Sequence, residues 1–132
     1  MPVKNEERYI EDAIKSVLDQ TYSNFELIII NDGSSDSTSH KIKSFNDKRI
    51  SLIETKGVGK NIAFNMGYEA SNGKFICYFA GDDLLPKDSL SKRLEPLIGK
   101  EQDLLASVSK VKTISEIKKF DGGSLTKADS LF

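Results

Sequence analysis

Apolar side chains recur every three or four residues near the start of the chain, over about residues 6–20. This spacing places them on one face of a helix. The members of the face are Tyr9, Ile10, Ala13, Ile14, Val17 and Leu18. We expect Asn5 to cap this helix, with Glu6 and Glu7 in its first turn, where the helix dipole favours acidic side chains. The pattern indicates no strand before the helix.

Two short apolar runs without polar alternation follow, at residues 25–30 and 75–79. Runs of this kind are typical of strands buried on both faces of a parallel sheet. Each ends in a polar turn: Asn31-Asp32-Gly33-Ser34 follows the first, and Gly81-Asp82-Asp83 follows the second. Because Cys77 lies inside the second run, we expect it to fill space in the core.

The remaining pattern alternates between helix and strand signals. Helices are predicted over about residues 36–45, 62–70 and 88–94, and strands over 50–54 and, more weakly, 103–113. Ser35 or Asp36 is expected to cap the first of these helices, and Pro96 to limit the last one. The tail from about residue 115 is expected to be irregular. This alternation indicates an α/β fold with an open, mostly parallel sheet flanked by helices.

Composition narrows the class of protein. A length of 132 residues indicates a single domain, 1–132. Lysine and arginine number 19 against 20 acidic residues, so no basic excess suggests a nucleic-acid partner. The single cysteine excludes an internal disulfide, and no apolar run approaches the roughly 20 residues of a membrane helix. The acidic first residues do not resemble a signal peptide. We expect a cytoplasmic location, with peripheral attachment at the inner face of the membrane as the alternative.

Three acidic residues follow the two buried runs, and they carry the candidate chemistry. In an open α/β sheet, ligands bind beyond the carboxyl ends of the strands. If the two runs are parallel strands, Asp32, Asp82 and Asp83 converge on one crevice. Carboxylates that converge repel one another unless a cation holds them, and hard oxygen ligands suit Mg²⁺ or Mn²⁺. Because magnesium is usually completed by phosphate oxygens and water, a nucleotide diphosphate is the expected ligand.

Plainer interpretations remain open for each motif. Taken alone, both acidic turns are also ordinary loop sequences. A calcium loop starting at Asp32 is excluded, because its sixth position is Ser37 and its twelfth is Lys43. The stretch Gly57-Val58-Gly59-Lys60 lacks the spacing of a phosphate-binding loop. Lys56 and Lys60 are expected to be exposed, with a phosphate contact as the alternative.

Four stretches of the chain, in order and spacing, resemble family-two glycosyltransferases with the GT-A (Rossmann-like) fold over roughly residues 2–98. They are residues 2–22, residues 25–38, residues 65–76, and the Asp82-Asp83 turn with Pro86. This resemblance implies a domain that transfers a sugar from a nucleotide diphosphate donor to an acceptor, as in polysaccharide biosynthesis. It also implies a divalent metal, Mg²⁺ or Mn²⁺, and favours a UDP-sugar as the donor.

The resemblance also implies residue roles. Asp32 resembles the acid that hydrogen-bonds the donor's base, and Pro2 and Val3 resemble the segment whose backbone lines the base pocket. Asp82 and Asp83 resemble the end of the family's Asp-x-Asp turn. On this basis Asp82 contacts the ribose and the metal, and Asp83 binds the metal on the diphosphate.

Departures from the family pattern qualify these roles. Ala80 stands at the first acid of the Asp-x-Asp turn, and Phe64 replaces a frequent donor-contacting arginine. The strand that normally precedes Pro2 is missing. The family's catalytic base lies in a later, acceptor-binding half, so the catalytic residues here are unknown, and Asp121 and Asp129 are not assigned that role.

The sequence therefore predicts the nucleotide-binding half of an inverting glycosyltransferase, truncated and with a sheet incomplete at both ends. Whether the chain is itself an enzyme is left open. The alternative is a non-catalytic nucleotide-sugar-binding fragment or an inactive remnant. An incomplete sheet exposes strand edges, so self-association is also expected. The acceptor, the linkage and the donor sugar are not predicted.

Overall fold

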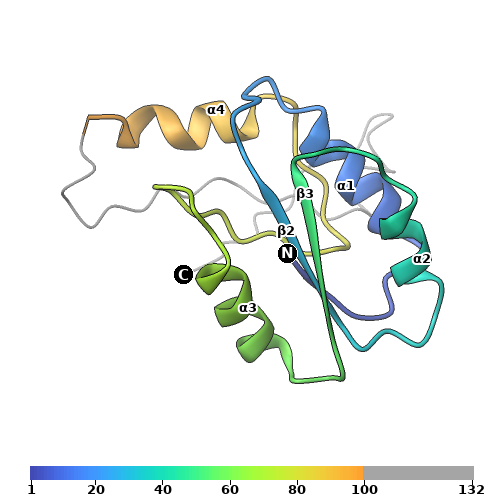
Figure 1. The fold of residues 1–132 in the computed structure, drawn as a ribbon. Helices are drawn as coiled ribbons and strands as arrows, with labels where there is room; N and C mark the ends of the chain where they lie inside the picture. The colour runs from blue at the N-terminus through green and yellow to red at the C-terminus, as the bar shows by residue number, and fades with distance from the viewer. Residues whose placement is uncertain (100–132) are drawn as a thin grey trace, which may run out of the picture. The chain divides into compact units, whose positions relative to one another are not determined.

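The computed structural model describes residues 1–99 (Figure 1). Its elements are β1 (Pro2–Val3), α1 (Ile10–Leu18), β2 (Leu27–Asp32), α2 (Thr38–Lys43), β3 (Ile50–Thr55), α3 (Lys60–Glu69), α4 (Ser89–Leu94) and a 3₁₀ helix (Glu95–Leu97). The predicted α/β class is confirmed. The strand predicted at 103–113 and the irregular tail from 115 lie outside the described residues.

The chain divides into two compact units, Met1–Leu90 and Ser91–Phe132. Most of the second unit lies outside the described residues, so the single domain over 1–132 stays a prediction. Within residues 1–99, none of the helices has the length and the apolar content to cross a membrane.

The described sheet has three parallel strands in the order β1-β2-β3. Along its full length β2 pairs with β3, from Leu27 opposite Ile50 to Asp32 opposite Thr55. On its other side, β2 pairs with the two residues of β1, and Val3 lies opposite Asn31. All three strands therefore end at the same edge of the sheet.

The two faces of β2 pack against different helices. Leu27 and Ile29 belong to a core cluster that includes residues of α1 and α2, whereas Ile28 and Ile30 pack with Ala63 of α3. Figure 1 shows the same arrangement, with α1 and α2 on one side of the sheet and α3 on the other. Every residue of β2 is buried, which confirms the strand predicted from its unbroken apolar run.

The segment before α1 differs from the prediction in two ways. A short strand, β1, precedes the helix. The sequence did not predict it, because two residues are too few to give a periodic signal. Moreover, α1 begins at Ile10, and Asn5 does not cap it. Asn5 instead adopts a left-handed backbone, with φ at 56°. Its N–H donates to Ser34 Oγ at 3.0 Å, and its Oδ1 accepts from the N–H of Ser35 at 2.8 Å. Asn5 therefore binds the turn after β2 and does not cap α1.

The strand predicted at residues 75–79 is wrong, because this segment forms no strand. Phe79 is buried, but Tyr78 is 60% exposed and Cys77 is exposed, so Cys77 is not core filler as predicted. A strand needs a partner for its backbone N–H and C=O groups. The sheet edge at β1 offers only the two residues Pro2 and Val3 for pairing. Residues 75–79 are therefore apolar but, within residues 1–99, have no strand to pair with.

Candidate functional site

Asp32 ends the central strand and is held by three donors, one from the end of β3 and two from the loop between β3 and α3. Its Oδ1 accepts from Thr55 Oγ1 at 2.5 Å and from the N–H of Val58 at 2.6 Å. Its Oδ2 accepts from the N–H of Gly59 at 2.9 Å. The hydrogen bond from Thr55 is the main cause that lowers the pKa of Asp32, although burial opposes it. The buried side chain is therefore an ionised carboxylate in a fixed position.

Two glycines bring the loop after β3 close to the turn after β2. A Cβ on Gly33 would lie 2.9 Å from the backbone nitrogen of Gly57. Both residues also have positive φ, +71° and +86°. A positive φ disfavours a side chain at both positions, and the spacing also excludes one at Gly33, so the glycines permit the contact that places Val58 and Gly59 on Asp32.

The turn after β2 is also tied to the segment after β1. The N–H of Glu6 donates to Thr38 Oγ1 at 2.8 Å, and the N–H of Glu7 donates to Asp36 Oδ2 at 3.1 Å. In return, the N–H of Ser37 donates to Glu7 Oε2 at 3.1 Å. The loops after β1, β2 and β3 thus form one hydrogen-bonded edge around Asp32.

The Asp82-Asp83 turn is anchored on both sides by neighbouring residues. Before it, a Cβ on Gly81 would lie 2.6 Å from Val3 Cγ1, so any side chain there would force a shift. After it, Ser16 Oγ accepts from the N–H of Leu85 at 3.1 Å. Asp82 itself is exposed, and Asp83 is half-buried.

The pKa of Glu6 is affected by the negative charge of the second acidic turn. Its pKa is raised mainly by burial, and also by the negative charges of Asp82 and Asp36. The acidic turn therefore lies beside the segment that follows β1.

The structure places the predicted site residues along one edge of the sheet. Pro2 and Val3 form β1, and Val3 lies beside Asn31, the residue before Asp32. Because Gly81 contacts Val3, the second acidic turn lies at the same edge as the first. Both the convergence of Asp32, Asp82 and Asp83 on one crevice and the roles of these residues stay predictions.

Among the predicted site residues, Asp82 and Asp83 are the candidate ligands for a metal ion. In the part of the chain that the structure describes, no three His, Cys, Asp or Glu side chains gather closely enough to hold a metal ion. Mg²⁺, however, is commonly bound by one or two carboxylates, with water and substrate phosphates completing its shell. The adjacent Asp82 and Asp83 fit such a partial ligand set.

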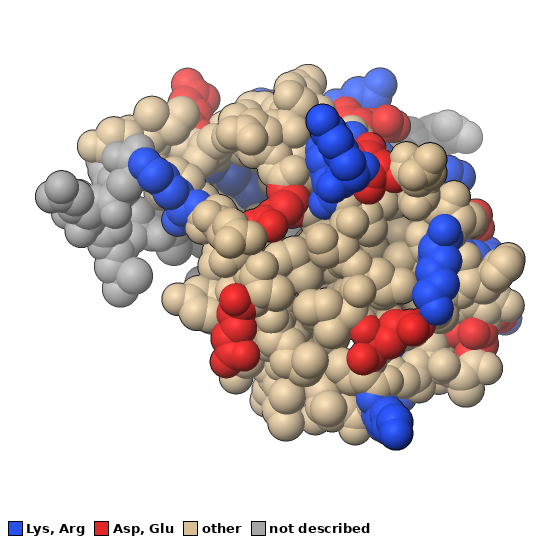
Figure 2. Space-filling model, in the orientation of Figure 1, with Lys and Arg blue, Asp and Glu red and all other residues tan. Residues whose placement is uncertain are grey.

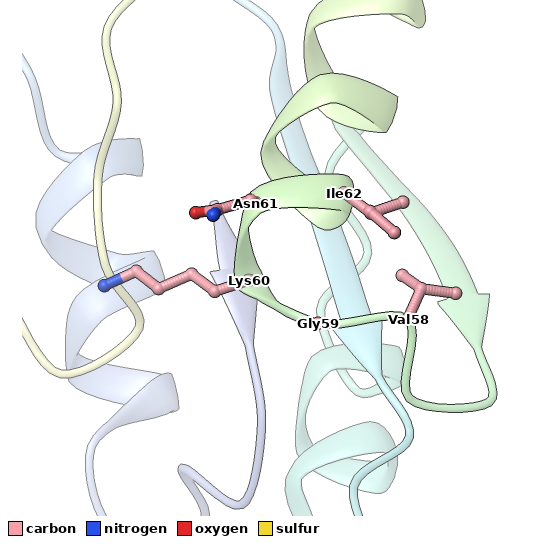
Figure 3. A pocket seen from close by; sticks show the side chains of 5 residues that line it. All are labelled: Val58, Gly59, Lys60, Asn61 and Ile62. Atoms are coloured by element: carbon pink, nitrogen blue, oxygen red, sulfur yellow. The ribbon is translucent and has the colours of Figure 1, made fainter.

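A surface hollow of about 340 Å³ lies at the start of α3, beside the residues that hold Asp32. In Figure 3, Lys60 and Asn61 point to one side of Gly59, and Val58 and Ile62 to the other. Figure 2 shows a broad uncharged surface over α3 and β3, with charged side chains scattered around it. The hollow thus offers a cation on one side and apolar groups on the other.

Phe64, which replaces the arginine frequent in the glycosyltransferases that the chain resembles, forms an aromatic pair with Tyr78. The rings of Phe64 and Tyr78 meet edge to face, with centroids 4.9 Å apart. The ammonium of Lys60 lies 5.8 Å from the centroid of the Phe64 ring. A cation is therefore present near this position, although it comes from one turn earlier in α3.

Thr55 and Gly59 are site residues that the sequence did not suggest. The predicted strand ended at residue 54, one residue before the hydroxyl that meets Asp32. Only the register of β2 against β3, which puts Thr55 opposite Asp32, identifies it. The sequence offered no local signal for this pairing.

A parallel sheet with a fixed carboxylate at the end of its central strand, and an acidic turn at the same edge, is typical of α/β domains that place ligands beyond the carboxyl ends of their strands. The chain belongs to the glycosyl transferase family 2, whose sequence model matches residues 1–120. The resemblance found in the sequence is thereby confirmed.

Individual relatives agree with this assignment. The chain is 36% identical over 121 residues to an uncharacterized glycosyltransferase of Rickettsia bellii, covering 91% of this chain and 17% of that protein. It is 35% identical over 99 residues to the Escherichia coli UDP-Glc:alpha-D-GlcNAc-diphosphoundecaprenol beta-1,3-glucosyltransferase WfgD, covering 74% of this chain and 39% of that one. The chain therefore spans well under half the length of these relatives.

Solved structures agree on the fold. The crystal structure of S. aureus TarS 1-349 in complex with UDP matches with a TM-score of 0.62 and 21% identity. The match covers 75% of this chain and 30% of that chain. This likeness supports a GT-A fold.

Proposed function

We propose that this chain binds the nucleotide diphosphate of a sugar donor, with Asp32 accepting a hydrogen bond from the base, for inverting transfer of the sugar. The observation that carries the proposal is the set of contacts around Asp32. Its two oxygens receive three donors from the protein, while a carboxylate accepts about four hydrogen bonds. One acceptor position therefore remains on Oδ2 for a ligand.

A uracil base suits this position, because its ring N–H is a donor and the carboxylate offers only acceptors. Two relatives favour the same choice: WfgD is named for UDP-Glc, and TarS was crystallised with UDP. Pro2 and Val3 would line the base pocket with their backbone, since β1 runs beside the end of β2. We therefore favour a UDP-sugar as the donor.

Asp82 and Asp83 would hold Mg²⁺ or Mn²⁺, with Asp82 also contacting the ribose. When bound, the metal offsets the charge of the departing diphosphate. The contribution of this chain is the exposed position of the turn, which Gly81 and Leu85 fix on either side.

Transfer also requires a base that removes a proton from the acceptor hydroxyl, and general-base assistance is typically worth about 10²–10⁴ in rate. Residues 1–99 hold no side chain that we assign to this role. The proposal for residues 1–99 is therefore donor binding, and the base stays unassigned. We also keep a cytoplasmic location, a role in polysaccharide biosynthesis and self-association through the sheet edge as parts of the proposal.

Titration calorimetry of the purified chain with UDP, with and without Mn²⁺, tests the binding proposal. We expect binding in both conditions and tighter binding with Mn²⁺. Equal affinities would remove the metal from the scheme, and no heat in either condition would contradict the nucleotide site. A donor-hydrolysis assay beside the titration separates a transferase from a binder without turnover.

A further inference from the structure

The hydroxyl of Thr55 approaches the candidate base-binding acid closely. It donates to Asp32 Oδ1 at 2.5 Å, within the range of charge-assisted O–H···O⁻ bonds. The two residues face each other across the β2–β3 ladder, so the sheet register fixes both backbones. The contact therefore belongs to the rigid part of the fold and not to a loop.

The contact also decides which oxygen of Asp32 stays available. Oδ1 receives both Thr55 Oγ1 and the N–H of Val58, while Oδ2 receives only the N–H of Gly59. With Oδ1 filled, a ligand donor is directed to Oδ2. Rotation of the carboxylate would break the short bond to Thr55, so the hydroxyl also opposes reorientation of the side chain.

We propose that Thr55 is a positioning residue for nucleotide binding, which orients the Asp32 carboxylate so that one position on Oδ2 faces the base. This inference rests on the proposed function, because it takes Asp32 as the acid that contacts the base. Thr55 itself does not touch the ligand in this scheme. Its effect reaches the nucleotide through Asp32 alone.

A second role follows from the same contacts. Gly59 is the residue before α3, so Asp32 binds the chain at the start of the helix that carries Lys60 and Asn61. When Thr55 orients the carboxylate, it also sets where α3 begins relative to β2. The base end of the site and the hollow beside α3 are therefore held by one carboxylate.

The test compares three single variants of the full 132-residue chain. Thr55→Val removes the hydroxyl and keeps the branched shape, and Thr55→Ser keeps the hydroxyl. Thr38→Val is the control, because Thr38 is a buried threonine whose hydroxyl also ties two distant segments together, but it accepts from the N–H of Glu6 and does not reach Asp32. UDP with Mn²⁺ is the probe, titrated calorimetrically at pH 5, 6 and 7.

We expect Thr55→Val to weaken UDP binding about 10-fold, as loss of one hydrogen bond to a charged group implies. Thr55→Ser should retain most of the affinity. Thr38→Val should lower the melting temperature while leaving UDP affinity close to that of the unsubstituted chain. The proposal would be overturned if Thr55→Val bound UDP as tightly as the unsubstituted chain at all three pH values. It would also be overturned if Thr55→Ser did not recover the affinity.

An NMR titration of the Asp32 carboxyl carbon provides the readout that does not need a ligand. Loss of the Thr55 hydrogen bond should raise the pKa of Asp32 in Thr55→Val but not in Thr38→Val, while Lys4, the charged neighbour acting on Asp32, is unchanged in both. If the unsubstituted chain does not bind UDP, the proposed function fails. The titration then still decides whether Thr55 holds the carboxylate, and an unchanged Asp32 pKa in Thr55→Val would contradict that.

Discussion

The two acidic turns at the edge of the sheet are built in different ways. Asp32 is buried and receives three hydrogen bonds from the protein, whereas Asp82 is exposed at a turn held by its neighbours. The first acid is fixed before any ligand arrives. The second is placed at the correct edge, but its carboxylate remains open to solvent. In the function that we propose, this difference gives a rigid base end and a diphosphate end that is completed only when metal and donor bind.

Replacing Asp32 by asparagine should give the largest effect on binding. An amide has no charge and presents an NH₂ where the base or a backbone N–H needs an acceptor, so we expect UDP affinity to fall about 10–100-fold. Calorimetry at pH 7 measures the loss. Asp19→Asn, on an exposed acid after α1, is the control and should bind UDP normally. Unchanged affinity in Asp32→Asn would remove the distinction between the two turns.

Gly81→Ala should lower stability by about 1–3 kcal/mol, because the added methyl group lies 2.6 Å from Val3 Cγ1 and forces a shift. Gly67→Ala is the matched control. Its methyl group would meet Ile30 at an ordinary 3.7 Å within α3, so helix propensity predicts a gain of about 0.5–1 kcal/mol. Urea unfolding of both variants measures the difference. If the two variants were equally stable, the packing of Gly81 on Val3 would not be what anchors the second turn.

Asp83→Ala should remove only the contribution of the metal. We expect the variant to bind UDP in Mn²⁺ as weakly as the unsubstituted chain does in a chelator, a loss on the order of 10-fold. Its affinity without metal should stay unchanged, since the role that we propose for Asp83 is to hold the metal. A fall in metal-free affinity would show that Asp83 acts on the nucleotide directly.

Glu6→Gln should give the smallest effect, and one of opposite sign to Asp32→Asn. The pKa of Glu6 is raised in the folded chain, so its contribution to stability is present below the ordinary value of 4.5 and is lost as the pH rises through the raised pKa. The variant should therefore melt slightly higher at pH 7 and equally at pH 4.

Asp32 behaves in the reverse way, because its pKa is lowered. Its contribution is present above the ordinary value of 3.8 and is lost as the pH falls through the lowered pKa. Asp32→Asn should consequently be destabilised at pH 7 and approach the unsubstituted chain in acid. Melting curves from pH 2 to 8 on both variants would reveal the two opposed trends, and parallel curves would contradict them.

The sequence predicted the α/β order because its strongest patterns coincide with the best-packed elements. The run at 25–30 is buried on both sides in β2, and the helical face from Ile10 to Val17 packs in the core. Asp32 was found for the same reason, since it closes the clearest strand. Prediction failed at residues 75–79, where an apolar run lacks a strand partner, and at Asn5, where a contact distant in sequence replaced a local cap. Thr55 depends on strand register, which no local pattern contains.

The close approach of Gly33 and Gly57 has a consequence for how this protein tolerates change. A Cβ on Gly33 would meet the backbone of Gly57, so no substitution elsewhere can make room for it, whereas a side chain at Gly57 is disfavoured by its φ of +86°. In a saturation library of the chain, we expect the codon for Gly33 to be depleted of every alternative, and the codon for Gly57 of all residues that do not tolerate a positive φ, although neither position contacts a ligand in our scheme. Designers who wish to alter donor choice would do better to diversify residues 58–62 and leave this glycine pair untouched.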